Sequence, residues 1–293
     1  MSPSQTLEQK ASSKTKRALV VIRCGDKSLH PEYINTASEF DVVLSYFGDA
    51  IPYDLANVQY VHYYKGSKWE GLNHFFSSYP EVWQGYDYIW LPDDDLSADA
   101  QNINQFLEIC DKEQFDLAQP ALTHNSYKSF LITIQVQGLL YRRTNFVEIM
   151  APLFSRQALE ICAPSFAENK SGFGLEFLWR KLLSGRKLGI IDKTPVYHTR
   201  PVGSAGNGVG QYSSISRTPK QEKKSLFRKY RLFAKNKKCF AAVTESGKSI
   251  SDVGELRKLI RKGLPVSEVD HDQVRRKIYR MVCSERQLKY IFW

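Results

Sequence analysis

Three consecutive aspartates follow an apolar run in the stretch YDYIWLPDDDLSAD, residues 86–99. Asp93, Asp94 and Asp95 come directly after a segment whose Ile89 and Leu91 are candidates for the core. Adjacent carboxylates repel one another unless solvent or a cation offsets their charge. Carboxylate oxygens are also the ligands that hard divalent cations prefer. The stretch therefore indicates a cation site, and the question is what that cation would hold.

Three interpretations fit the aspartate triplet. In the first it is a solvated turn in which Asp95 caps the next helix. In the second it ends the acidic strand of an ATPase. In the third it is the Asp-x-Asp site of a nucleotide-sugar glycosyltransferase, where Asp93 and Asp95 reach one divalent cation that bridges the donor diphosphate and stabilises the leaving group.

A second motif bears on the ATPase interpretation. The stretch AVTESGKS, residues 242–249, fits a loose phosphate-loop pattern, but Ala242 replaces the first glycine and Glu245 would repel phosphate. Only 44 residues follow it, too few for the sheet that completes such a domain, and the acidic strand precedes it. These departures argue against an ATPase.

Strands and helices alternate in the first part of the chain. Apolar and β-branched runs predict strands at 17–23, 40–49, 58–66, 86–91 and 115–122, and spacings of three and four predict helices within 69–83 and 98–113. Alternation of this kind is typical of an α/β sheet covered on both faces. Ligands of such sheets bind beyond the carboxyl ends of the strands, where Asp93–Asp95 and the Gly25–Asp26 turn fall.

The later segments are less regular. Residues 145–159 are expected to lead into a helix with Pro152 early in it, and 172–185 to be a glycine turn that opens a helix. A strand is predicted at 187–200. Residues 201–214 contain four glycines and are expected to be a mobile loop. From Lys220 onward the chain is basic and is predicted to be mostly helical.

Composition limits the class of protein. The chain has 293 residues, 42% hydrophobic and 25% charged, enough for one large domain or two smaller ones. No apolar run approaches the roughly 20 residues of a membrane span. Residues 1–16 are polar, which argues against a secretory signal, and are expected to be a disordered tail. Five scattered cysteines suit free thiols in a reducing compartment, and so we expect a cytoplasmic protein.

The positive charge is concentrated at one end. Residues 217–293 hold 21 Lys and Arg against 8 Asp and Glu, whereas residues 1–216 hold 20 against 23. We therefore divide the chain into a domain at 17–216 and a basic, mostly helical C-terminal extension at 217–293. The extension is expected either to make peripheral contact with an anionic membrane or to pack as a helical cap on the domain. No nucleic-acid partner is expected, because 217–293 has no aromatic-plus-glycine binding motif.

Five stretches occur in an order that resembles a known family: YDYIWLPDDDL, DLAQPAL, NFVEIMAPLFSRQAL, GFGLEFLW and GIIDKTPVYHTRPVG. The order resembles the family called domain of unknown function 707, a group of glycosyltransferase-like proteins. More broadly, it is similar to glycosyltransferases of the GT-A fold. The resemblance covers about Ala18 to Gly203 and implies a Rossmann-type mixed sheet flanked by helices.

The resemblance also implies roles for the residues that match. Asp93 and Asp95 would hold a divalent cation, with His198 completing the shell; such a mixed carboxylate and imidazole shell favours Mn²⁺ over Mg²⁺. Glu176 would be the general base of an inverting enzyme. The alternatives are a structural hydrogen bond for His198 and an acid on the helix dipole for Glu176.

Further residues are candidates for contacts with the two substrates. Glu148 is expected to contact the acceptor or to cap a helix. The candidates for donor binding lie at strand ends or beside the glycine loop, and the two lysines among them are equally compatible with solvated positions: Arg23, Asp26, Lys65, Lys68, Asp93, Asp94 and Arg200.

Together these observations predict a metal-dependent glycosyltransferase. It would move a sugar from a nucleotide-sugar donor to the hydroxyl of a saccharide or lipid-linked saccharide acceptor in cell-surface glycan synthesis. The alternative is a non-catalytic glycan- or nucleotide-binding protein that retains the GT-A fold.

Overall fold

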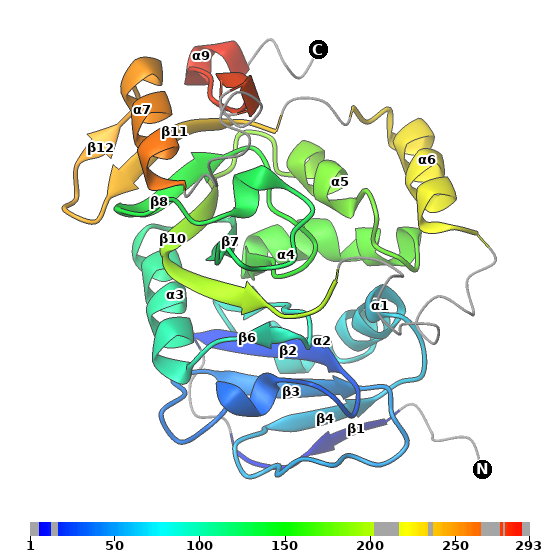
Figure 1. Ribbon diagram of the computed structural model, residues 1–293. Coiled ribbons are helices and arrows are strands. Elements are labelled where there is room, and N and C mark those ends of the chain that lie inside the picture. Colours follow the sequence, from blue (N-terminus) through cyan, green and yellow to red (C-terminus); the bar gives the residue numbers. More distant parts are fainter. Residues whose placement is uncertain are drawn as a thin grey trace.

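One mixed sheet forms the centre of the protein (Figure 1). The computed structural model describes residues 6–12, 17–201, 217–233, 237–264, 276–277 and 279–288. Within them the strand order is β1 (Thr6–Gln9), β4 (Tyr60–Tyr63), β3 (Asp41–Tyr46), β2 (Ala18–Cys24), β5 (Tyr88–Trp90), β9 (Leu153–Ser155), β7 (Leu117–Leu122), β10 (Leu188–His198), β8 (Leu139–Thr144), β11 (Cys239–Thr244) and β12 (Ser249–Ile250). The short strand β6 (Leu96–Ser97) pairs with β10 outside this path.

The strands run in both directions. β4, β3, β2 and β5 are parallel neighbours, as are β7 and β10, whereas β9 is antiparallel to both β5 and β7. Strands β2, β3 and β5 are buried along their whole length, as expected for a parallel sheet covered by helices. The carboxyl ends of β2 and β5 therefore lie at the same edge, which brings Gly25 close to the aspartate triplet.

Helices flank this sheet and confirm the predicted α/β class (Figure 1). They are α1 (Lys68–Ser78), α2 (Pro80–Trp83), α3 (Ala100–Lys112), α4 (Arg156–Cys162), α5 (Leu175–Leu182), α6 (Pro219–Tyr230), α7 (Val253–Gly263) and α9 (Glu285–Leu288). Three short 3-10 helices accompany them: η1 (His30–Glu32), η2 (Leu131–Thr133) and η3 (Ala163–Glu168). Among the described residues no helix has the length and apolar character needed to cross a membrane.

An aromatic cluster joins the two helices that carry candidate site residues. The ring of Trp69 in α1 lies 5.4 Å from that of Trp179 in α5, and Phe166 of η3 lies 4.9 Å from Trp69. Trp69 and Trp179 are fully buried. Because large buried aromatic side chains contribute much of the packing energy of a core, this cluster fixes the positions of α1 and α5 relative to each other.

Several sequence expectations differ from the structure. Part of the expected disordered tail, residues 6–9, forms β1, because its backbone pairs antiparallel with β4 at the sheet edge and Leu7 packs against the core. Pro152 does not lie early in a helix: it precedes β9, and α4 begins only at Arg156, where Ser155 supplies the cap. The predicted glycine loop at 201–214 lies, from residue 202, outside the described residues.

The basic C-terminal segment is joined to the domain and is not a separate layer. Strand β11 pairs antiparallel with β8, and so the predicted boundary at 216/217 does not coincide with a break in the sheet. Residues 242–249, the loose phosphate-loop pattern, form part of the β11–β12 hairpin, whose turn contains Gly247 at a φ of 84°. No helix begins there, which agrees with the rejection of the ATPase interpretation.

Candidate active site

Asp95 and His198 meet because their strands are paired. β6 begins at Leu96, directly after the aspartate triplet, and its Leu96 lies opposite His198 of β10. The backbone N–H and the hydroxyl of Thr199 both donate to the carbonyl of Asp95, at 3.1 and 3.0 Å. The interpretation of Asp95 as a helix cap is wrong, because α3 is capped by Asp99, whose side chain accepts from the N–H of Asn102.

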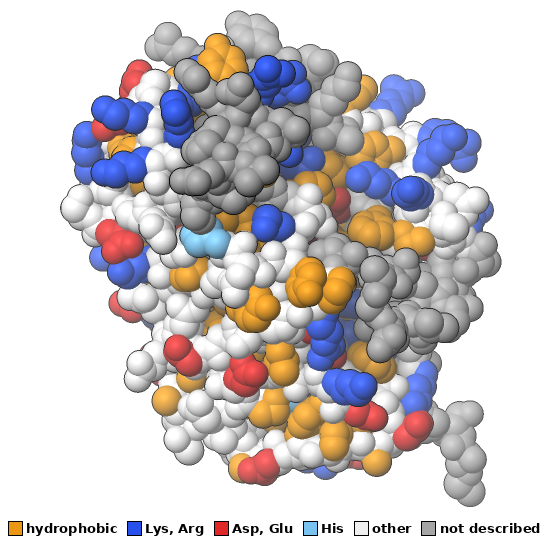
Figure 2. All heavy atoms as spheres, in the orientation of Figure 1, with side chains coloured by type: hydrophobic (Ala, Val, Ile, Leu, Met, Phe, Trp, Pro, Cys, Tyr) orange, Lys and Arg blue, Asp and Glu red, His pale blue; other side chains and the backbone are white. Residues whose placement is uncertain are grey.

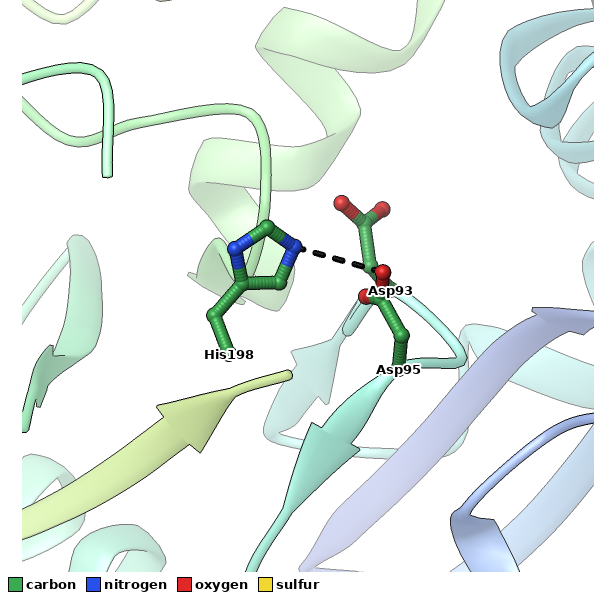
Figure 3. Close-up of side chains that lie close together, drawn as sticks. All are labelled: Asp93, Asp95 and His198. Carbon is green, nitrogen blue, oxygen red and sulfur yellow. Dashed lines mark ion pairs between the residues drawn. The ribbon is translucent and has the colours of Figure 1, made fainter. Parts of the chain in front are cut away.

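Asp93, Asp95 and His198 form the only group of three or more candidate metal ligands found in the described part of the chain (Figure 3). One potential ligand atom from each lies within 4.8 Å of the others. The ring of His198 is held by its Nδ1, 2.7 Å from the carbonyl of Tyr127; since a carbonyl only accepts, Nδ1 carries the proton. Nε2 therefore faces Asp95, with 3.3 Å between Nε2 and Oδ2.

The electrostatics of this group favour a bound cation. Burial raises the pKa of Asp93. Burial also raises the pKa of Asp94 to about 6, and the charge of the neighbouring Asp95 contributes to this shift. Burial alone would lower the pKa of His198, but the hydrogen bond and the charge of Asp95 outweigh it and the net shift is upward. Three carboxyl groups are thus crowded together at one edge of the sheet, which is a situation that a metal ion relieves.

A second observation also fits a divalent metal held by these three side chains. Asp95 Oδ1 is buried and has no hydrogen-bond partner. Buried carboxylate oxygens are normally paired, because an unpaired one costs free energy on the order of 1–3 kcal/mol. Two carboxylates and one imidazole are a donor set that suits Mn²⁺ and also permits Mg²⁺.

The protein places a positive charge of its own beside Asp93, the ammonium group of Lys68. Its Nζ donates to Asp93 Oδ1 and to the carbonyls of Leu91 and Ile149, both at 3.1 Å. Lys68 is the first residue of α1, whose start is fixed by a capping box between Ser67 and Glu70. The prediction placed this lysine at the donor phosphates; the structure places its ammonium group on a metal-ligand candidate.

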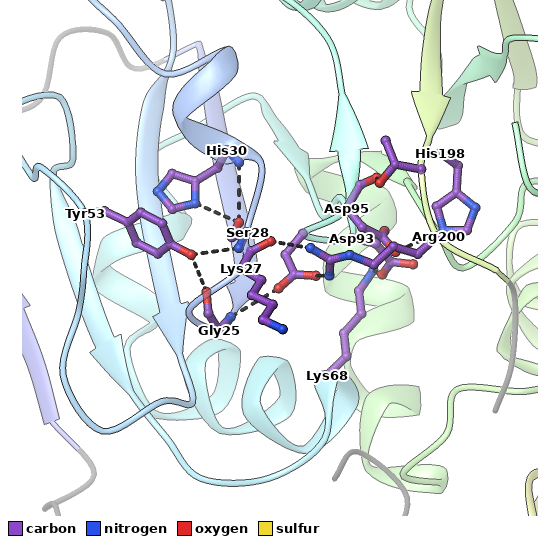
Figure 4. Close-up of polar contacts among 12 residues, drawn as sticks. Gly25, Lys27, Ser28, His30, Tyr53, Lys68, Asp93, Asp95, His198 and Arg200 are labelled. Carbon is purple, nitrogen blue, oxygen red and sulfur yellow. Dashed lines mark hydrogen bonds and ion pairs between the residues drawn. The ribbon is translucent and has the colours of Figure 1, made fainter. Parts of the chain in front are cut away.

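Asp94 and Arg200 connect the aspartate triplet to the loop after β2. Figure 4 shows Arg200 between Lys27 of that loop and Asp93. Asp94 Oδ2 accepts from the N–H of Gly25 at 3.2 Å, and Arg200 Nη1 lies 3.3 Å from Asp94 Oδ1. Arg200 Nη2 also donates to the carbonyl of Lys27. The Arg200 side chain remains 40% exposed, so it keeps access to solvent at this edge of the sheet.

Arg23 is a structural clamp in this fold. It is 4% exposed, and its five N–H donors go to the carbonyls of Ser45, Tyr64, Gly66 and Ser67 and to the Ser45 hydroxyl. Burial lowers its pKa to about 10. A guanidinium group has no sixth donor, and so Arg23 has none left for a nucleotide.

Two other donor-binding candidates are not brought to the metal group. Lys65 forms an exposed ion pair with Asp49, 2.6 Å long. Asp26 is exposed and accepts from the hydroxyl of Tyr46. Neither of these contacts involves Asp93, Asp95 or His198.

Two carboxyl groups lie buried beyond the metal-ligand candidates. Glu176 Oε2 accepts from the N–H of Gly174 at 2.9 Å, at the N-terminus of α5, and Gly174 adopts a φ of 103° that favours glycine. Burial raises the pKa of Glu176 and raises that of Glu148 to about 8, where the charges of Glu176 and Asp93 add to the shift. Glu148 Oε2 has no hydrogen-bond partner. Glu148 thus interacts electrostatically with both Glu176 and the metal group.

Sequence reasoning missed two lysines near Glu176. Lys223 of α6 and Lys237 both act electrostatically on the Glu176 carboxyl, although both belong to the basic segment that we assigned to an extension. Their ammonium groups lie 4.8 and 5.2 Å from the centre of the Phe177 ring. The only signal in the sequence was the alternation of basic and aromatic residues at 223–240.

Comparison with known proteins gives one family match. Residues 36–145 match the family described as "Protein of unknown function (DUF707)". This confirms the resemblance inferred from the sequence over those residues, which include Asp93–Asp95. No curated protein matches the sequence.

Solved structures give more distant similarities. Staphylococcus aureus TarS 1–349 is 10% identical, with a TM-score of 0.39, 62% of this chain and 60% of that chain being covered. TarS 1–349 in complex with UDP-GlcNAc is 9% identical, with a TM-score of 0.42 and coverage of 90% and 70%. A197 from STIV is 12% identical, with a TM-score of 0.42 and coverage of 87% and 99%. The chain spans 37% of a longer TarS chain.

Proposed function

We propose that this protein is a metal-dependent glycosyltransferase that uses a nucleotide-sugar donor. The observation that carries the proposal is the group Asp93, Asp95 and His198 at the carboxyl edge of parallel strands, with the buried carboxyls of Glu148 and Glu176 beyond it. A metal-ligand set and neighbouring carboxylic acids are the two parts that glycosyl transfer to a hydroxyl requires.

Each residue of the group has a proposed role. Asp93, Asp95 and His198 hold the cation, for which Mn²⁺ is the better candidate. When bound, that cation would offset the charge of the leaving nucleotide diphosphate as a Lewis acid. Arg200, which contacts Asp94 and is 40% exposed, is proposed to bind phosphate oxygens. The three N–H donors of Lys68 already go to Asp93, Leu91 and Ile149, and so its proposed role is to offset the charge of Asp93.

Glu176 is the proposed general base of an inverting transfer. An acceptor hydroxyl becomes a good nucleophile only when a base takes its proton as the bond to the sugar forms. Burial raises the pKa of Glu176, but the α5 N-terminus and the two nearby lysines oppose that shift and so help this carboxyl to ionise, as a base must. Burial raises the pKa of Glu148 to about 8, where the charges of Glu176 and Asp93 add to the shift, and this favours its neutral form. We therefore propose that the protonated carboxyl of Glu148 donates a hydrogen bond to the acceptor saccharide.

We further propose that the enzyme acts in the cytoplasm on a saccharide or lipid-linked saccharide acceptor of cell-surface glycan synthesis. Figure 2 shows Lys and Arg side chains gathered over α6 and α7. On α7 the side chains of Lys258, Arg261 and Lys262 are exposed. Each such charge near an anionic leaflet contributes about 1 kcal/mol, so this helix would give weak, salt-sensitive attachment. Co-sedimentation with anionic liposomes tests it, and attachment that persists in 1 M salt contradicts it.

The alternative is a nucleotide- or glycan-binding protein without turnover. It is favoured by Lys68, which already provides Asp93 with a cation. Both functions predict donor binding, and only the enzyme releases free nucleotide diphosphate when an acceptor is added. A rigorous assay therefore follows diphosphate release from bound donor.

The first experiment is a thermal-shift screen of UDP-, GDP-, CMP- and dTDP-sugars, each with and without Mn²⁺. A ligand at 100 times its Kd stabilises the native state by about 2.7 kcal/mol, which is easily measured. We expect one nucleotide class to raise Tm only with metal present, and to lose that effect in Asp95→Ala. Stabilisation that is equal with Mn²⁺ and with EDTA contradicts metal-dependent donor binding.

A further inference from the structure

The basic segment is anchored on the loop that leads to Glu176. Glu222 of α6 accepts from the N–H groups of Lys170 and Ser171, at 3.2 and 3.0 Å. Leu226 of the same helix is 3% exposed, and its Cδ2 would be 3.1 Å from a Cβ placed on Gly174. α6 is thus packed directly on the turn that opens α5.

Two ammonium groups from this segment converge beside Glu176. Lys237 Nζ lies 4.5 Å from the Phe130 ring centre and 5.2 Å from that of Phe177. Lys223 Nζ lies 4.8 Å from the Phe177 ring centre. The two positive groups therefore share contact with one aromatic ring, next in sequence to the proposed base.

Neither ammonium group has an acceptor among the residues that the structure describes. Within the described ranges, Lys223 and Lys237 take part in no hydrogen bond or ion pair, and both side chains are partly buried. Glu176 acts electrostatically on both ammonium groups but forms no ion pair or hydrogen bond with either; its Oε2 accepts from the N–H of Gly174. Burial lowers the pKa of Lys237, and the charges of Lys223 and Arg180 lower it further, whereas the charges of Glu176 and Glu148 oppose that shift. Partly buried like charges that have no hydrogen-bonded counter-ion are costly, and an anionic ligand that contacts both relieves that cost.

We propose that Lys223 and Lys237 form an anion-binding subsite beside Glu176 and that the acceptor is an anionic saccharide, carrying a phosphate or a carboxylate group. The assignment of this ligand as the acceptor rests on the proposed function. The ammonium groups hold the anionic group, and the hydroxyl next to it is then directed to Glu176. The aromatic rings of Phe130 and Phe177 exclude water around the contact, which strengthens it.

The test uses the full chain in EDTA, so that the metal-dependent donor site does not contribute. Glucose, glucose 6-phosphate and glucuronic acid are titrated by saturation-transfer NMR and calorimetry into the wild type and into Lys223→Gln, Lys237→Gln and the double variant. Lys224→Gln is the matched control, an exposed lysine on the same helix.

We expect an anionic probe to bind and neutral glucose to bind at least tenfold more weakly, with the stronger anionic probe showing whether phosphate or carboxylate is recognised. Each lysine replacement should weaken that probe about tenfold, equivalent to about 1.4 kcal/mol, and Lys224→Gln should not. Without ligand, Lys237→Gln should unfold at the same or a higher temperature than the wild type, since a repulsion is removed.

Binding of neither anionic probe, equal affinity for glucose and the anionic probes, or unchanged affinity in the double variant would overturn the inference. Mn²⁺-dependent binding of UDP-, GDP-, CMP- and dTDP-sugars is measured in parallel on the same proteins. If none of these donors binds while the anionic probe binds, the proposed function fails and the subsite stands; the reverse result leaves donor binding intact and removes the subsite.

Discussion

Glu148→Gln should remove a specific pH dependence of stability. Native Glu148 has a pKa raised from 4.5 to about 8, chiefly by burial. Between those values the unfolded state ionises this carboxyl and the folded state keeps its proton. The unfolded state then binds fewer protons, and so stability falls as pH rises, by about 1.4 kcal/mol per pH unit. The stabilisation is fully present below pH 4.5 and is lost as pH rises to 8.

The magnitude follows from the interval. From pH 5 to pH 8 the wild type should lose about 4 kcal/mol that Glu148→Gln does not lose, because glutamine carries no titrating proton. The comparison is of each protein's change in the free energy of unfolding between the two pH values. The cost of burying the glutamine amide does not depend on pH, and so it cancels in that change. Urea unfolding followed by circular dichroism measures both free energies of unfolding.

Glu160→Gln is the control, since Glu160 is exposed on α4. It should keep the wild-type pH dependence. Parallel pH profiles for the wild type and Glu148→Gln, within about 1 kcal/mol, would refute the reasoning that burial keeps this carboxyl neutral.

Three further changes test other parts of the structure. Glu176→Gln should keep donor affinity and cut the single-turnover rate of transfer about 10²–10⁴-fold, and a loss confined to donor affinity would assign Glu176 to binding. Arg142→Met should lower the free energy of unfolding in urea by about 3–5 kcal/mol, because it leaves Asp192 charged in a site where both side chains are 0% exposed; a loss below about 1 kcal/mol would contradict this. Lys68→Met should lower the free energy of unfolding by about 1–3 kcal/mol without metal and by less with Mn²⁺, since the metal then takes the place of the ammonium group beside Asp93. Equal losses in both conditions would contradict the idea that the metal and the ammonium group offset the same charge.

The metal-ligand candidates were predictable from sequence because their chemistry is local. Three adjacent carboxylates after a buried strand have few physical explanations, and that strand leads to the ligand edge of a parallel sheet. His198 was reached only through resemblance. Its meeting with Asp95 depends on the pairing of β6 with β10, and the two residues of β6 give too short a pattern to predict.

Other roles depended on tertiary contacts that no local pattern contains. Arg23 lies at the end of the predicted strand, but its five donors are taken by the Ser45 hydroxyl and by carbonyls that β3, the end of β4 and the start of α1 bring together. Strand β11 was missed because its residues follow a basic stretch that was predicted to be helical, whereas pairing with β8 decides its conformation. The lysines beside Glu176 were missed for the same reason, since α6 reaches that place only by packing on Gly174.

Calorimetric titration of the nucleotide-sugar that the thermal-shift screen selects is the most direct test of the central claim, that Asp93, Asp95 and His198 bind a metal for a nucleotide-sugar donor. The comparison is between wild type, Asp95→Asn and the control Asp87→Asn, whose aspartate is exposed just before β5, each in Mn²⁺ and in EDTA. The account predicts binding by the wild type and the control in Mn²⁺ only, and affinity reduced by about 100-fold in Asp95→Asn. Equal affinity for that donor in Asp95→Asn and the wild type would contradict it.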